Sequence, residues 1–299
     1  MSMQEQQVAV PILRKPLGIR LGSASVAWIK KRPVGAIGLF MVVAIIVLAI
    51  GSPVFERYDP LYQSAPERFK SPSFTHFMGT DDFGRDMWAR VVAGSVISLQ
   101  VAFIAISTGA TFGFFIGVLS GYAGGVTDNI IQRGVEVMLA LPGLLLALAL
   151  IATLGSGVDK VIIALTIIFI PRTVRVMRGT VLSVKENVYV DAARSIGARP
   201  VRIMLRHIAP NVMAPFLIIF SSLLGTAILT EATLSFLGLG IPPPHPSWGR
   251  MLSGAAMQYA ITAPWMVIFP GLAITWLVLG FNLFGDALRD TWDPRLRGT

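Results

Sequence analysis

Six long apolar runs, separated by polar segments, dominate the chain. They cover residues 34–52, about 98–122, about 137–154, about 161–176, about 213–237 and about 265–283. A helix rises 1.5 Å per residue, so about 20 apolar residues cross the roughly 30 Å of hydrocarbon in a bilayer. The pattern therefore predicts an all-α polytopic membrane helix bundle with six transmembrane helices. An even number of spans places both ends of the chain on the same side.

The basic residues indicate which side that is. Six Lys/Arg residues precede the first run, and eight lie from Arg172 to Arg206, between the fourth and fifth runs. The connections after the third and fifth runs hold one each, Lys160 and Arg250. Cytoplasmic segments carry the excess of Lys and Arg, so we expect both termini and the segment after the fourth run to face the cytoplasm. Arg172 and Arg175 then fall in the last turn of the fourth span, at the membrane interface.

These boundaries give a domain plan. Residues 1–33 form a cytoplasmic tail whose Trp28 and Lys30 are typical of an interfacial segment. The first transmembrane helix spans 34–52, and an extracytoplasmic loop spans 53–96. Residues 97–286 form a five-helix transmembrane domain, and residues 287–299 form a cytoplasmic tail. About 33 residues precede the first run, too many for an ordinary signal peptide, so we expect a retained anchor.

Composition agrees with a membrane protein. Of the 299 residues, 54% are hydrophobic and only 14% are charged, whereas soluble domains carry about 25% charged residues. The net charge of +9 follows from the topology, and no basic–aromatic platform indicates nucleic acid binding. The absence of cysteine excludes disulfides, thiolate metal sites and cysteine nucleophiles.

The longest polar-rich interval after the second run is residues 187–210. Helical spacing places four apolar residues on one stripe: Tyr189, Ala192, Ala193 and Ile196. Gly197 follows, where a helix favours a left-handed residue. The sequence therefore predicts a short helix that ends at a glycine corner.

A second helix is predicted to begin at Pro200, whose missing N–H costs nothing in a first turn. Its apolar stripe is Val201, Met204, Leu205 and Ile208, and its opposite face is basic, with Arg199, Arg202 and Arg206. We expect Pro210 to end this helix. A basic amphipathic helix of this kind lies against a membrane surface, and the whole stretch is shaped to dock into a groove of a soluble partner.

The second run carries glycines at a spacing of four, namely Gly109, Gly113, Gly117 and Gly121. Such a line lets another helix approach closely. Ordinary packing within this chain is the preferred interpretation, and a gliding interface or a subunit contact is the alternative.

Two features near the outer end of the fifth run are candidates for a pathway or an outer gate. Glu231 is an ionisable residue inside a span, so lining of a pathway and structural pairing both stay open. The segment Gly240–Trp248 contains four prolines, which forbid a helix and favour polyproline II. It is either a docking ledge for an external partner or a rigid connector with Trp248 in the interfacial aromatic belt.

Residues 79–86 contain the one cluster of carboxylates, with Asp81, Asp82 and Asp86 around Arg85. Acid–base chemistry or cation binding is conceivable, but the spacing does not fit an EF-hand. We favour carboxylates at the start of the helix that enters the second run, stabilised by its dipole and by Arg85.

Motifs for enzymatic chemistry are absent from the sequence. No Gly-Lys dipeptide is present, so the chain has no Walker-type phosphate loop, and no HExxH or GxSxG occurs. The three histidines, His76, His207 and His245, have no metal-ligand spacing. We therefore expect no catalytic residue, no metal and no bound cofactor in this chain.

The stretch 187–210 resembles the EAA loop of ABC-importer permeases. The matching positions are Asp191, Ala192, Ala193, Gly197 and Pro210, with Asp191 replacing the usual Glu and Ala209 where Leu is common. The segments 77–90, 231–252 and 281–298 are similar to the second permease subunit of the dipeptide, oligopeptide and nickel transport family. The resemblance covers nearly the whole chain from about residue 25.

The resemblance implies a type I ABC-importer transmembrane fold in a bacterial inner membrane. It implies a second, homologous permease subunit, two cytoplasmic ATPase subunits that bind ATP and magnesium, and an extracytoplasmic binding protein. The ATPase-coupling residues would be Asp191, Ala192, Ala193, Arg194, Ser195, Gly197 and Pro210. Small peptides are the expected substrates, with glutathione, opine-like compounds or nickel as alternatives. An ATP-independent channel or secondary carrier is the alternative from another class.

Overall fold

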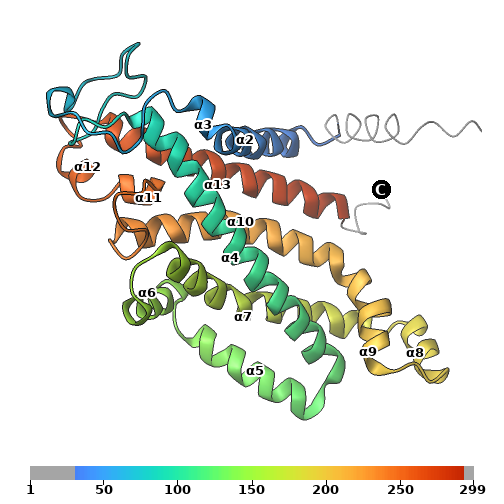
Figure 1. The fold of residues 1–299 in the computed structure, drawn as a ribbon. Helices are drawn as coiled ribbons and strands as arrows, with labels where there is room; N and C mark the ends of the chain where they lie inside the picture. Colours follow the sequence, from blue (N-terminus) through green and yellow to red (C-terminus); the bar gives the residue numbers. More distant parts are fainter. Residues whose placement is uncertain (1–30, 293–299) are drawn as a thin grey trace, which may run out of the picture.

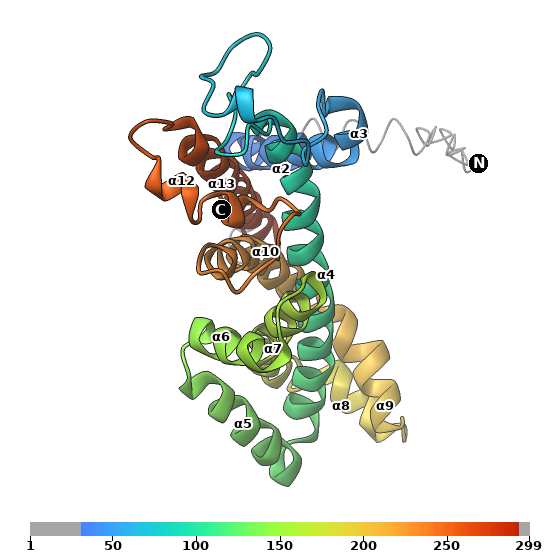
Figure 2. The same ribbon diagram turned by 60° about the vertical axis from the view of Figure 1, so that its left-hand side comes forward.

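The computed structural model describes residues 31–292, and the regular elements in this range are helices (Figure 1). Most of the predicted cytoplasmic tail, including Trp28 and Lys30, lies outside the described residues, as do residues 293–299. The expected all-α architecture is confirmed for the described range. Four long helices, α2, α4, α10 and α13, form one part of the bundle, and α5, α6 and α7 flank it (Figure 2).

The first and last long helices pack side by side. Helix α2 spans Pro33–Ile50 and α13 spans Trp265–Trp292. A Cβ added at Gly38 would lie 2.8 Å from the carbonyl oxygen of Gly280, so the two backbones almost touch. The indole N–H of Trp276 donates to the carbonyl of Met41 at 3.1 Å. Helix α13 also packs on α10, Met213–Phe236, which in turn packs on α4, Met87–Ala123.

The glycine line of α4 lies against α7, Val158–Val184. A Cβ at Gly109 would lie 2.7 Å from the carbonyl oxygen of Thr166, and one at Gly113 would lie 2.6 Å from the Cβ of Thr173. Gly117 and Gly121 meet Met177 and Val181 in the same way. This helix pair therefore has backbones in near contact, and the close approach expected from the glycine spacing occurs within this chain.

The third apolar run does not form one straight span. Helix α5 covers Gly125–Ala140 and α6 covers Gly143–Leu154, with a bend of 89° between them. Pro142 lies at the break, where it has no N–H for a continuing helix and biases Leu141 to extended backbone. The apolar run 137–154 is therefore not one continuous helix, and it crosses from α5 into α6 at this break.

Two other helix boundaries differ from the sequence prediction. Helix α4 begins at Met87, inside the predicted loop 53–96. Helix α7 continues to Val184, so Arg172 and Arg175 lie in its interior and not in its last turn. Charged residues within α7 did not stop the helix, because arginine is a good helix former and hydropathy alone does not set a helix end.

Within residues 31–292, four helical stretches are long and apolar enough to cross a membrane, and the bent α5–α6 pair gives a fifth if it is taken as one span. Helix α7 is not among them, because charged residues interrupt its apolar part at both ends. The structure thus supports a polytopic membrane protein with four to five spans by length and composition.

Short elements gather at the two ends of the bundle (Figure 1). At one end lie α3 Ser52–Phe55, the 3-10 turn Ala65–Glu67, α11 Trp248–Met251 and α12 Ala255–Gln258. At the other end lie α8 Val188–Ser195 and α9 Pro200–Ile203. These two ends hold the candidate sites.

Candidate functional site

The first candidate site is residues 187–212, which we call the knob. It packs beside the last turns of α4 and α7 and projects away from them (Figures 1 and 2). Helix α8 ends in a turn that satisfies its last carbonyls: Gly197 N–H donates to Arg194 O at 2.9 Å, and Ala198 N–H donates to Ala193 O at 3.1 Å. This pair of bonds is the Schellman motif, which requires a left-handed residue. Gly197 supplies it with φ +77°, and the predicted glycine corner is confirmed.

The buried side of α8 differs from the predicted stripe. Val190 and Ala193 are buried in a cluster with Phe114 and Val118 of α4 and with α7 residues. Tyr189 and Ile196, which were predicted to be on the apolar stripe, are exposed. Four-residue spacing identified a helix but not the face that meets the ends of α4 and α7.

The second half of the knob is helical throughout and runs into α10. After α9 come a π-helical turn, Met204–Ile208, and a 3-10 turn, Ala209–Val212. Pro210 therefore does not end the helix, contrary to the prediction, because the change of helix type provides a place for a residue without an N–H. Ile203 and Ile208 are buried. The predicted stripe residues Val201 and Leu205 are exposed, and so are the three arginines of the basic face, Arg199, Arg202 and Arg206.

Polar residues of α8 bond within the knob or to α4. Asp191 accepts from Arg194 Nη1 at 3.1 Å, and Ser195 Oγ donates to the carbonyl of Asp191 at 3.0 Å. The Arg194 guanidinium lies 5.5 Å from the ring centroid of Tyr122, at the end of α4. Asp191, Ala192 and Arg194 are exposed. The knob is thus anchored on one side and leaves its other side open.

A polar cluster holds α5 beside the base of the knob. The Arg178 guanidinium on α7 donates to both oxygens of Asp128 on α5, with Nε–Oδ1 at 2.7 Å. Ser120 of α4 donates to the same carboxylate. Lys185 donates from Nζ to the carbonyl of Gly121 at 2.9 Å. Helices α4, α5 and α7 are therefore tied together where the knob begins.

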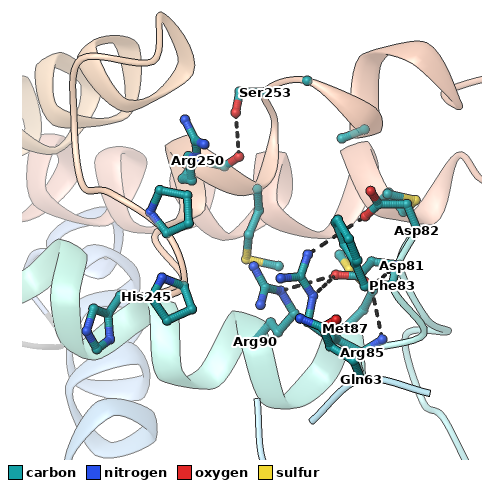
Figure 3. Close-up of a pocket in the computed structure, with 16 residues that line it drawn as sticks. Gln63, Asp81, Asp82, Phe83, Arg85, Met87, Arg90, His245, Arg250 and Ser253 are labelled. Atoms are coloured by element: carbon teal, nitrogen blue, oxygen red, sulfur yellow. Dashed lines mark hydrogen bonds and ion pairs between the residues drawn. The ribbon is translucent and has the colours of Figure 1, made fainter. Parts of the chain in front are cut away.

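The second candidate site is a pocket of about 370 Å³ at the opposite end (Figure 3). We call it the outer pocket, because the sequence predicts that this end is extracytoplasmic. One wall comes from residues 81–90, around the start of α4, and the facing wall comes from residues 243–254. Figure 3 shows Arg85 and Arg90 beside Asp81, with Arg250 and His245 on the facing side. The sequence indicated the first wall through its cluster of carboxylates. Nothing in the sequence of residues 243–254 indicated that this segment would face residues 81–90.

Asp81 is the centre of the charge network in this pocket. Its carboxylate accepts from Arg85 Nε at 2.6 Å and from the backbone N–H groups of Phe83 and Arg85 at 2.9 Å. The Arg90 Nε lies 3.5 Å from the same carboxylate. Charged residues with so little exposure need such pairing, because an isolated buried charge is very costly.

Asp86 is the N-cap of α4. Its Oδ1 accepts from the N–H of Ala89 at 2.8 Å, and its Oδ2 lies 2.8 Å from Nδ1 of the buried His76. The preferred interpretation of the carboxylate cluster, a helix start stabilised with Arg85, is confirmed. The His76 contact was not predicted, since it joins two residues of an irregular loop that has no periodic pattern.

Asp82 is the least paired acid of the outer pocket. Its nearest cation is Arg85, with Nη2–Oδ1 at 3.8 Å. Partial burial raises the pKa of Asp82, and the negative charge of Asp81 raises it further. A carboxyl with a raised pKa ionises less readily than an exposed one.

Glu231 and Trp248 are both buried within this chain. The Glu231 carboxylate accepts from Ser98 Oγ on α4 at 3.2 Å and from Ser235 Oγ at 2.7 Å. The Trp248 indole N–H donates to the carbonyl of Val91 at 2.9 Å. Placement of Trp248 in an interfacial aromatic belt is wrong, because the ring packs against Gly94 of α4. The segment 240–247 is non-helical, as expected.

The described residues contain no group of three or more His, Cys, Asp or Glu side chains that could hold a metal ion. The outer pocket has arginines around its acids, which opposes cation binding. The geometry therefore offers two candidate docking sites. The knob has an apolar and basic surface, and the outer pocket is a charged recess.

Comparisons with known proteins agree across most of the chain. Residues 113–298 match the family model described as "Binding-protein-dependent transport system inner membrane component". The dipeptide transport system permease protein DppC of Alkalihalophilus pseudofirmus is 40% identical, over 90% of this chain and 88% of the relative. The glutathione transport system permease protein GsiD of Escherichia coli is 42% identical, over 86% of this chain and 85% of the relative.

The matched region includes the knob, five of the six apolar runs in whole or in part, and the segment that forms one wall of the outer pocket. Helices α5 and α6 with their break also lie inside it. The chain therefore belongs to the family of binding-protein-dependent transport system inner membrane components, as a multi-pass permease subunit of an ABC importer that is not itself catalytic.

Proposed function

We propose that this chain forms half of the translocation pathway of an importer of small peptides, and that the knob couples it to a cytoplasmic ATPase subunit. The observation that carries the proposal is the open surface of the knob. Val188 and Ile196 are 83% and 85% exposed, and Val201 and Leu205 are also exposed. Apolar side chains gathered on a projecting element mark a surface for a protein partner.

Charge and shape agree with a soluble partner. The exposed arginines of the knob border the apolar residues, so the surface has an apolar centre and a basic edge, a common arrangement at interfaces. Gly197 has open space around it, with no atom within 4 Å of an added Cβ. A partner groove can therefore approach the backbone closely at this corner. We assign the contact to Asp191, Ala192, Arg194, Ser195 and Gly197, with the buried Ala193 holding α8 in place and Pro210 shaping the base of the knob.

The same proposal also specifies the other subunits of the transporter. The chain pairs with a second, homologous permease subunit, and each permease presents one knob to one of two ATPase subunits. When the ATPases close on ATP, the knobs move together and the helix bundles tilt. The permease contributes two conformations and no bond chemistry. A binding protein delivers the substrate at the end that holds the outer pocket.

The proposal also includes the number of membrane-crossing segments and their orientation. The bent α5–α6 pair and α7 join the four long helices to give six membrane-crossing segments, in a type I ABC-importer arrangement. The basic knob supports placing it and both termini in the cytoplasm. For the substrate, the similarity to a dipeptide permease favours small peptides. The similarity to a glutathione permease keeps this modified tripeptide as an alternative.

The test uses Gly197→Glu and Gly197→Ala in the assembled transporter. A Cβ in a left-handed conformation costs about 1 kcal/mol, and a glutamate also blocks the close approach of a partner. We expect normal insertion and abundance for both variants, a partial loss of uptake for Gly197→Ala, and loss of uptake and of ATPase copurification for Gly197→Glu.

The matched control is Gly238, which also has a positive φ and no atom within 4 Å of an added Cβ, but lies at the other end of α10. Gly238→Ala imposes similar backbone strain and should leave ATPase copurification intact. Normal uptake by Gly197→Glu at normal abundance would contradict the coupling assignment.

A further inference from the structure

A third cavity, away from the knob and the outer pocket, lies among α5, α6, α7 and α10. It has a volume of about 380 Å³, within the range of small-molecule sites. Arg172 of α7 and three threonines of α10, Thr226, Thr230 and Thr233, supply its polar groups. Apolar residues such as Phe169 complete the lining. We call it the threonine pocket.

Arg172 is the charged residue of this pocket. It lies in the interior of α7, six residues before Arg178, which corresponds to about 9 Å along the helix axis. Arg178 is paired with Asp128, whereas Arg172 has no ion pair or hydrogen bond from its side chain among residues 31–292. An arginine inside a membrane helix is costly and usually faces a pathway or a partner charge. Arg172 therefore provides an unused site for an anionic group.

The threonines provide hydrogen-bond acceptors, whereas Arg172 provides donors. Each hydroxyl donates its proton to a carbonyl of its own helix: Thr226 to Ser222, Thr230 to Thr226 and Thr233 to Leu229, at 2.7–3.2 Å. The oxygen lone pairs are then left as acceptors. The pocket thus offers the N–H donors of the Arg172 guanidinium on α7. It also offers a row of hydroxyl oxygens on α10 that can accept hydrogen bonds.

The break between α5 and α6 also borders this cavity. Leu139 comes from one side of the break, and Gly143 and Leu144 come from the other. Non-helical backbone at membrane depth occurs where protein covers it or where it lines a water-filled cavity. This position argues for an aqueous passage beside the break.

We propose that the threonine pocket is a transit site for the backbone of a small peptide on its way through the membrane. The Arg172 guanidinium binds the terminal carboxylate through paired N–H donors. The threonine oxygens accept from the terminal ammonium and amide N–H groups, and the apolar lining receives a side chain. This inference rests on the proposed function and narrows its substrate class to solutes with a free carboxylate and an amine. The lining residues include no carboxylate, imidazole or sulfur group, so a bare metal ion has no ligand here.

The test compares uptake of alanyl-phenylalanine with uptake of its carboxamide by the complete transporter in vesicles. The binding protein is the same in every assay, so a change in the acid-to-amide ratio between variants belongs to the permease. Arg172→Gln should lower that ratio on the order of tenfold, because a hydrogen-bonded charge pair is lost. Arg172→Lys should retain part of the preference. Thr230→Val, which removes one acceptor, should reduce uptake about threefold.

Arg175→Gln is the matched control, since Arg175 is, like Arg172, an exposed arginine of α7, but it does not line the pocket. A second measurement does not depend on delivery: photolabelling of the complex with alanyl-(4-benzoyl)phenylalanine. Label should appear on peptides of α6 or α10, should be lost in Arg172→Gln, and should persist in Arg175→Gln. Label confined to α2 or α13 would overturn the proposal.

The remaining outcomes are distinct. Equal losses of acid and amide uptake in Arg172→Gln would indicate a structural role and overturn the transit site. A copurifying phospholipid that is lost in Arg172→Gln, with an unchanged acid-to-amide ratio, would make the pocket a lipid site. Failure of the wild-type complex to take up either probe in response to ATP, with no ATPase bound, would instead refute the proposed function itself.

Discussion

The two ends of the molecule differ in how their charged and apolar groups are satisfied. In the outer pocket, Asp81, Asp86 and Arg90 are nearly buried and are paired inside the chain. In the knob, Val188 and Ile196 are more than four-fifths exposed, and Arg199, Arg202 and Arg206 are exposed on its surface.

The outer end is therefore preorganised within this chain, whereas the knob presents an exposed surface. Pairing inside the chain stabilises the outer end without any partner, so changes there should alter folding. The knob has its anchors, Val190 and Ala193, but its outward surface contributes little to the stability of this chain. Changes on that surface should alter assembly with a partner and leave folding intact.

The largest expected effect on stability is at Trp248. Trp248→Ala removes a fully buried ring and its hydrogen bond to Val91, and should lower the free energy of unfolding by about 3 to 5 kcal/mol. Denaturant unfolding in detergent micelles measures the change. Trp276→Ala makes the same replacement at a ring that is 42% exposed and should cost clearly less. Equal losses of unfolding free energy in the two variants would show that burial of Trp248 is not what stabilises the outer end.

A smaller effect is expected at Asp86. Asp86→Ala removes the N-cap of α4 and leaves the Nδ1 atom of the buried His76 without its partner, at a cost of about 2 to 3 kcal/mol. Asp86→Asn keeps an oxygen for the cap and should lose less. Thermal unfolding of the two variants distinguishes them, and identical midpoints would count against the capping role.

The smallest effect on stability is expected at Ile196. Ile196→Ser changes an exposed side chain and should shift the free energy of unfolding by less than about 0.5 kcal/mol. It should nevertheless weaken ATPase copurification. Val190→Ser, six residues earlier and fully buried, should destabilise the knob itself. If Ile196→Ser unfolds the chain, the knob surface is structural and the comparison between the two ends fails.

The sequence predicted the features that depend on local spacing. The long helices, the left-handed corner at Gly197 and the close approach along the glycine line of α4 all follow from residue type and interval. The break at Leu141–Pro142 carried a local signal, the Pro142-Gly143 pair, but the surrounding apolar residues hid it in a continuous run.

Features set by distant contacts could not be predicted in this way. Val190 is buried in place of Tyr189 because of what the ends of α4 and α7 present to α8. Trp248 is buried because Val91 and Gly94, more than 150 residues earlier in the chain, lie beside it. The threonine pocket joins four helices, and its arginine was predicted at an interface because the fourth apolar run was ended too early.

The near contact of α4 with α7 has a mechanical consequence. Helix α4 is about 55 Å long at 1.5 Å per residue, and its glycines leave almost no soft side-chain layer against α7. Two rods joined backbone to backbone turn as one lever and do not slide past each other. A rotation of only about 10° about one tip would sweep the opposite tip through about 10 Å, given the length that the helical rise sets.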